Sequence, residues 1–122
     1  MSQATESDLI GRMFAAFNAK EVSTLAELVT DDVRLRLGNA PTAEGKLAFV
    51  VAVKAFLGSV AGFRHAILNL WRDGQTVIAE LDVHYTRLDG GEVTLPCCNA
   101  FKLGDGLISE YRSYMDATPV YE

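Results

Sequence analysis

The sequence predicts an α+β domain in which three N-terminal helices pack in a cone against a strongly curved, mostly antiparallel sheet. The first observation is that apolar residues before position 61 recur mainly at helical spacing, with one alternating stretch among them. The second is that four long alternating runs follow one another from Phe63 onward, separated by Asp73-Gly74, Asp89-Gly90-Gly91 and Gly104-Asp105-Gly106. Asp-Gly between alternating runs is a strong signal of a β-hairpin. Helices followed by an antiparallel meander therefore define the fold class.

Three helices are predicted at residues 7–20, 23–29 and 46–60, where apolar side chains return every three or four positions. Between the second and the third helix, DDVRLRLG at 31–38 alternates apolar with charged residues, as in a strand with one buried face. The segment GNAPTAEG that begins at Gly38 is rich in turn formers and predicts a loop.

The four later runs are predicted strands at 63–71, 76–87, 92–103 and 107–115. They are nine to twelve residues long, whereas strands usually have about five or six. Long strands joined by tight turns favour a sheet with strong curvature. Pro96 lies inside the third run and has no N–H to donate, so we expect it at an edge or a bulge.

Length and charge limit the possible partners. The chain has 122 residues, which suits a single domain spanning residues 1–122. Its net charge of −5 argues against nucleic acid and anionic membranes, because both attract clustered Lys and Arg. No apolar run reaches the roughly 18 residues of a membrane-spanning helix, and the polar start MSQATESDLI lacks the features of a signal peptide. We therefore expect a cytoplasmic protein.

The cysteines and histidines give no metal-binding pattern. Cys97 and Cys98 are adjacent, so a strand directs them to opposite faces, which disfavours a shared metal ion or a relaxed disulfide. His65 and His84 come from different strands, without a carboxylate at ligand spacing. The sequence therefore predicts no metal site, and both cysteines are expected to be small buried residues.

The element order, the segment VTDDVRLRL after two helices and the closing DGLISEYRSYMD resemble the nuclear transport factor 2-like superfamily. The similarity is to its SnoaL-like branch, related to polyketide cyclases, ketosteroid isomerase and limonene epoxide hydrolase, and covers essentially the whole chain. It implies a pocket for a small apolar, oxygenated molecule at the mouth of the cone, and no cofactor. It also implies a homodimer through the outer sheet face, which the partly apolar Ile78, Cys98 and Ala100 favour as well.

The last strand supplies the main catalytic candidate. The SnoaL-like and epoxide-hydrolase branches end this strand with an acidic residue that acts as acid or base, and Asp116 matches it. Strand parity places Arg112 and Tyr114 on the same face as Asp116. In an apolar pocket, desolvation would raise the pKa of Asp116 and suit it to acid/base work, with Tyr114 as a hydrogen-bond donor. Alternatively, Asp116 pairs with Arg112 or caps the chain end, and stays ionised and inert.

Other predicted pocket residues come from the remaining strands. By parity, His65 faces inward if Phe63, Ile67 and Trp71 do, and it then partners Asp116; otherwise it is a satisfied, partly buried histidine. Asn99 lies among apolar residues and needs a partner, either a ligand oxygen or a backbone group or water. The remaining predicted ligand-binding residues are Asn39, Arg112, Leu37, Leu81, Val83 and Trp71.

One branch of the family is a poor match. Limonene epoxide hydrolase uses an Arg and an Asp that alternate on a central strand, where this chain has Leu81 and Val83. Glu80 and Asp82 are close in sequence but have the opposite parity, unless a bulge shifts the register. Leu37 also stands where that enzyme has a Tyr, although Asn39 matches its Asn. Two functions stay open: a cofactor-independent isomerase, cyclase, dehydratase or hydrolase, or a non-catalytic binding or accessory module.

Overall fold

The computed structural model describes residues 3–121, with side chains described from Leu9 onward. Its helices are α1 (Gln3–Asn18), α2 (Val22–Glu27), α3 (Lys46–Gly58) and the short α4 (Thr118–Tyr121). Its strands are β1 (Val29–Leu37), β2 (Ala43–Glu44), β3 (Gly62–Asp73), β4 (Thr76–Thr86), β5 (Glu92–Gly104) and β6 (Leu107–Tyr114). The three predicted helices and five main strands are all present, while α4 and β2 were not predicted.

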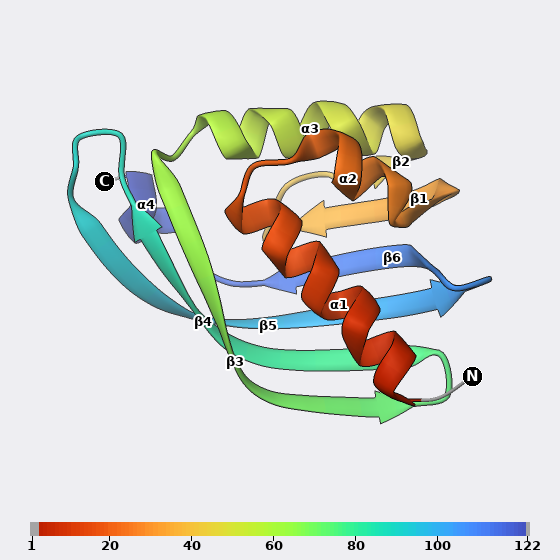
Figure 1. Cartoon of the computed structure of the whole chain (residues 1–122). Coiled ribbons are helices and arrows are strands. Elements are labelled where there is room, and N and C mark those ends of the chain that lie inside the picture. Colours follow the sequence, from red (N-terminus) through yellow and green to blue (C-terminus); the bar gives the residue numbers. More distant parts are fainter. Residues whose placement is uncertain (1–2, 122) are drawn as a thin grey trace.

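The strands form one sheet in the order β2-β1-β6-β5-β4-β3. Only the β1–β6 pair is parallel; the other neighbours among the described strands are antiparallel. The long strands bend, and α1, α2 and α3 lie against one side of the sheet (Figure 1). This arrangement confirms the predicted α+β class with a curved, mostly antiparallel sheet. None of the helices within residues 3–121 combines the length and the apolar character needed to cross a bilayer.

The hydrophobic core lies between the helices and the concave face of the sheet. Helix α1 contributes Ile10, Met13 and Phe17, and α3 contributes Phe49 and Val53, all nearly or fully buried. The inward faces of β4 and β5 consist of the buried residues Ala79, Leu81, Val83, Tyr85, Cys97, Asn99 and Phe101. These are the residues that strand parity places inward, so the prediction for both strands is confirmed.

Two β-bulges change which residues face inward. In β3, Ile67 pairs with Leu81 and Asn69 pairs with Glu80, so Leu68 is an extra residue. In β6, Ile108 pairs with Leu103 and Glu110 pairs with Lys102, so Ser109 is extra. A single extra residue moves every later side chain of the bulged strand to the opposite face. The Ser109 hydroxyl donates to the Lys102 carbonyl at 3.1 Å, which satisfies a backbone group at the irregularity.

The fold also settles two smaller expectations. Pro96 pairs with Asp82 on β4, while the pairing of β5 with β6 begins only at Cys98, so Pro96 has a neighbour on one side. The expected edge position of Pro96 is confirmed. Cys97 is buried as expected, but Cys98 is exposed, because the two neighbours occupy opposite faces and only one face is covered by helices.

Candidate functional site

A cavity of about 450 Å³ lies between the helices and the concave face of the sheet. Its wall is mostly apolar and aromatic, from Phe17, Phe56, Val83, Tyr85 and Met115, with polar side chains at a few positions. Asn99 and Ser113 are buried in this wall, whereas Asp116 and Asn39 lie at its solvent-exposed rim. An apolar cavity with a few convergent polar groups is the usual form of a small-molecule site.

A line of hydrogen bonds crosses the buried part of the wall. The Cys97 thiol donates to Asn99 Oδ1 at 3.2 Å, and Asn99 Nδ2 donates to the Tyr111 hydroxyl at 3.1 Å. Asn99 is only 1% exposed and lies in the cavity wall, and its partners within the described chain are side chains. Burial raises the pKa of Tyr111 well above its ordinary value. Its protonated hydroxyl accepts from Asn99 and keeps its own hydrogen for another acceptor.

His65 lines the same cavity from β3. Its ring lies 4.6 Å from the ring of Phe14 and 5.2 Å from that of Phe63, measured between centroids. Its Nδ1 lies 2.7 Å from Asn18 Oδ1. An amide oxygen only accepts, so Nδ1 carries the proton and Nε2 keeps its lone pair. Burial lowers the pKa of His65 from 6.5 to about 4, so at neutral pH the ring is an uncharged acceptor.

Asp116 lies at the rim of the cavity instead of its buried end, and its side chain is exposed to solvent. Its Oδ1 accepts from the Thr118 hydroxyl at 2.6 Å and from the Thr118 N–H at 3.1 Å. These hydrogen bonds lower the pKa of Asp116, so the predicted rise is wrong. Asp116 is an ionised cap at the start of α4, which agrees with the capping alternative.

Arg112, Tyr114 and Trp71 do not reach the cavity, contrary to prediction. The extra residue Ser109 moves Arg112 and Tyr114 to the outer face, where Tyr114 is 57% exposed. In β3, the extra residue Leu68 does the same to Trp71, which is 53% exposed. Both errors have one cause, since parity counted through a bulge gives the wrong face.

The other predicted lining residues divide between cavity and core. Leu37, Asn39 and Val83 line the cavity as predicted. Leu81 is buried on the inward face of β4 but packs in the core and is absent from the cavity wall. The residues that parity missed are Tyr111, Ser113 and Met115, the alternate set of the last strand. Tyr85, on the same inward face of β4 as Val83, also lines the cavity, and its hydroxyl donates to Met115 Sδ at 3.4 Å.

The pattern of β4 excludes the charged pair that limonene epoxide hydrolase needs at these positions. Leu81 and Val83 are buried and face inward, whereas Glu80 is exposed and Asp82 is partly exposed on the opposite face. No bulge interrupts the pairing of β4 with β5 that would turn Glu80 or Asp82 inward. Among the described side chains, from Leu9 to Tyr121, no three His, Cys, Asp or Glu residues come together in a way that could hold a metal ion.

Several solved structures share this fold. A nuclear transport factor 2-like protein of unknown function from Burkholderia pseudomallei has a TM-score of 0.86 and 15% identity, with coverage of 98% of this chain and 95% of its own. TerC, co-crystallised with polyporic acid, has a TM-score of 0.83 and 17% identity, with 94% of both chains covered. An LEH-like epoxide hydrolase from M. tuberculosis has a TM-score of 0.81 and 19% identity, covering 97% of this chain and 87% of its own.

At these identities the structural likeness shows the fold alone. Among curated proteins, none matches the sequence. The family is shown by the sequence itself, because residues 10–111, most of the chain, match the SnoaL-like domain. The curved sheet, the helices on its concave side and this match together identify the chain as a member of the SnoaL-like domain family, with a nuclear transport factor 2-like fold.

Proposed function

We propose that the cavity binds an apolar, oxygenated small molecule and transfers a proton on it without a cofactor, with His65 as the base. The observation that carries this proposal is one cavity that contains an uncharged imidazole, a protonated phenol and a buried amide. The base belongs to His65 and not to Asp116 or Tyr114, because Asp116 is committed to Thr118 and Tyr114 lies on the outer face.

The reaction class follows from these groups. His65 Nε2 accepts a proton from a carbon next to a carbonyl group, and the electron pair of that C–H bond moves to form an enolate. The Tyr111 hydroxyl and the second hydrogen of Asn99 Nδ2 donate to the enolate oxygen, where the negative charge develops. The imidazolium then returns the proton, which restores the neutral ring. Return to the same carbon regenerates the ketone, whereas return to the far carbon of an enolate conjugated with a C=C bond gives an isomerised product.

Deuterium exchange tests the proposal. We would incubate the protein in D₂O with a panel of cyclic ketones and enones, and follow loss of the protons next to the carbonyl by NMR. The exchange rate should rise with pH around pH 4 and then level off, because His65 is a base only when unprotonated. His65→Gln should abolish exchange, while His84→Gln, on the outer face next to Thr94, should retain it. Undiminished exchange in His65→Gln would refute the assignment.

A second function is favoured by a specific feature of the wall. Apart from Asp116 at the rim, the described lining residues include no carboxylate, so the cavity also suits a binding module without chemistry. Val83→Trp fills the cavity from β4 and distinguishes the two. Binding of panel compounds that Val83→Trp abolishes, with no exchange in the wild type, would favour the binding module.

We also propose that two copies pair through the outer face of the sheet. Cys98 is exposed there, and Ile78 and Ala100 are partly exposed, each on strands β4 or β5. Burying this apolar strip against a second copy would remove it from water. Light scattering at micromolar concentration should give twice the mass of the chain, and Ala100→Glu should halve that mass. A monomer mass for the wild type would refute pairing.

A further inference from the structure

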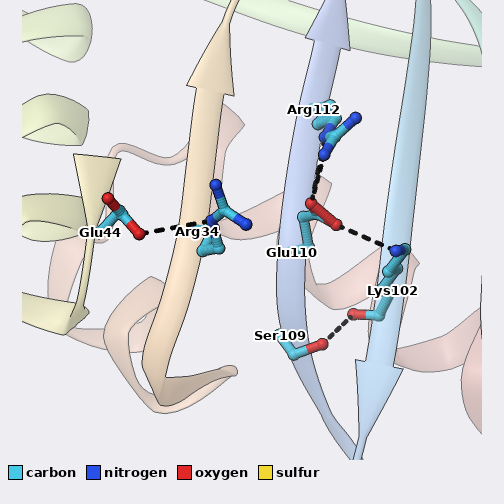
Figure 2. Close-up of polar contacts among 6 residues, drawn as sticks. All are labelled: Arg34, Glu44, Lys102, Ser109, Glu110 and Arg112. Atoms are coloured by element: carbon cyan, nitrogen blue, oxygen red, sulfur yellow. Dashed lines mark hydrogen bonds and ion pairs between the residues drawn. The ribbon is translucent and has the colours of Figure 1, made fainter. Parts of the chain in front are cut away.

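Two neighbouring rows of side chains cross the outer face of the sheet over β2, β1, β6 and β5. The first row contains Glu44, Arg34, Glu110 and Lys102, which the strand register places side by side. Figure 2 shows that the charges alternate along this row. Arg34 lies 3.6 Å from Glu44, and Lys102 lies 3.5 Å from Glu110. Opposite charges directly across a ladder stabilise a sheet.

The second row, two residues further along the strands, breaks this alternation. Arg36 on β1 is registered directly opposite Arg112 on β6, and the next partner of Arg112 is Ala100 on β5. Like charges directly opposite each other destabilise a sheet. The row has no carboxylate of its own, and Arg112 pairs instead with Glu110 in the first row.

Glu110 already has partners. Its side chain is only 10% exposed, and its Oε2 accepts from Arg112 Nη2 at 2.9 Å and from Arg112 Nε at 3.1 Å (Figure 2). Its Oε1 faces Lys102. Arg36 makes no hydrogen bond or ion pair with any residue of the described chain. Four cations against two carboxylates leave these rows at +2, within a chain whose net charge is −5.

The surface is hollowed beside the two opposed arginines. One hollow of about 190 Å³ is lined by Arg34, Arg36, Thr42, Glu110 and Arg112. A second of about 160 Å³ is lined by Arg36, Gly38, Asn39, Arg112, Ser113 and Tyr114. Arg36 and Arg112 belong to both hollows, so a ligand between them contacts two guanidinium groups. Thr42 lines the first hollow and Tyr114 lines the second, so each hollow also has a side-chain hydroxyl group.

We propose that Arg36 and Arg112 form a binding site for a small oxyanion, a phosphate or carboxylate group, on the outer face of the sheet. The planar guanidinium group binds such oxyanions with paired N–H donors, which a single ammonium cannot do. The ion pair with Glu110 fixes the position of the Arg112 guanidinium group. The N–H groups of the Arg36 guanidinium have no acceptor among the described residues and are available to the oxyanion. Gly38, Asn39 and Ser113 line both the second hollow and the cavity, so the two sites adjoin at this end of the sheet. The guanidinium groups themselves lie on the outer face, and the proposal does not depend on the function proposed for the cavity.

Inorganic phosphate is the probe for this site. Phosphate would be titrated into the ¹⁵N-labelled protein at constant ionic strength, with the amide shifts of β1 and β6 followed by NMR. Arg36→Gln should weaken phosphate binding by about tenfold or more, because it removes a charged donor from the ligand. Arg36→Gln should fold normally, because Arg36 makes no hydrogen bond or ion pair with another described residue. The matched control is Arg64→Gln, which removes another exposed arginine of a strand, on β3.

Three outcomes decide the question. Saturable shifts confined to the two hollows, lost in Arg36→Gln and retained in Arg64→Gln, support the site. Equal weakening in both variants would show general attraction of anions to arginines and overturns it. The oxyanion could instead be an acidic side chain of a second copy of the protein, and light scattering distinguishes this case from a free anion. If Arg36→Gln halves the mass while phosphate shifts no amides, the arginines serve pairing and the small-anion site is refuted.

Discussion

Asn18, the last residue of α1, receives a hydrogen bond from His65 on β3, with 2.7 Å between Asn18 Oδ1 and His65 Nδ1. This contact joins a helix to the edge strand of the sheet and fixes the tautomer of the only histidine in the cavity wall. The aromatic rings around it exclude water, so the imidazole resists protonation. One hydrogen bond at the end of a helix thus sets which ring nitrogen carries the proton and which keeps its lone pair.

We expect the stability of the protein to fall as the pH drops from 6.5 towards 4. In the folded state the pKa of His65 is about 4, below its ordinary value of 6.5, so the unfolded chain binds more protons in this window. The contribution of His65 to the free energy of unfolding is therefore fully present above pH 6.5. It declines by up to about 3 kcal/mol as the pH falls towards 4. Urea unfolding at several pH values measures it. His65→Gln should show a shallower decline over this window; an identical decline would contradict the shifted pKa.

The hydrogen bond between Asn99 and Tyr111 should couple the two residues. Tyr111→Phe leaves the buried Asn99 amide without an acceptor, which should cost about 1–3 kcal/mol of unfolding free energy. Asn99→Leu combined with Tyr111→Phe should cost less than the sum of the single changes, because an apolar pair leaves no buried donor unsatisfied. Urea unfolding of the four proteins completes the cycle. Additive losses would show that the bond contributes nothing specific.

Removing the Asp116 carboxylate should loosen α4 and leave the rest of the fold intact. Asp116→Ala removes the acceptor of the Thr118 N–H, so we expect faster hydrogen exchange of that amide. Asp116→Ser keeps a capping oxygen and serves as the matched control. Because the pKa of Asp116 is lowered in the folded state, protection should persist above its ordinary value of 3.8 and be lost as the pH falls through the folded pKa. Unchanged exchange in Asp116→Ala would exclude the capping role.

Arg36→Glu should stabilise the protein. The change places a carboxylate directly opposite Arg112 and restores the alternation of charge across β1 and β6. A gain of about 0.2–1 kcal/mol in unfolding free energy is expected at low salt, decreasing as salt screens the pair. Arg36→Gln, which only removes the repulsion, should gain less. A glutamate variant less stable than the glutamine variant would mean that the two arginines do not repel each other in the folded state.

The sequence predicted the fold well because its signals are local. Helical spacing, alternation and Asp-Gly turns each act within a few residues, and the faces of β4 and β5 followed from parity alone. The candidate site was predicted less well. Ser109 and Leu68 look like ordinary strand residues, yet each is the extra residue of a bulge. A bulge depends on pairing with the neighbouring strand, so no local pattern reveals it, and Arg112, Tyr114 and Trp71 were assigned to the wrong face.

Strand alternation also could not predict that Asp116 caps α4, because the strand ends at Tyr114 and the alternation does not extend to Asp116. His65 and Asn99 were found because they precede or avoid any bulge in their strands. In β3 and β6, the residues before the bulge are therefore assigned correctly, whereas Trp71, Arg112 and Tyr114, which follow it, are inverted.

The bulge at Ser109 also bears on how such a protein can change. Deleting this one residue would give an uninterrupted ladder with the same partners, because Ile108 already pairs with Leu103 and Glu110 with Lys102. Tyr111 and Ser113 would therefore still face the cavity, and Arg112 and Tyr114 would still face outward. A lineage can thus gain or lose a residue at this point without changing the chemistry of the cavity, because the bulge absorbs the difference in length.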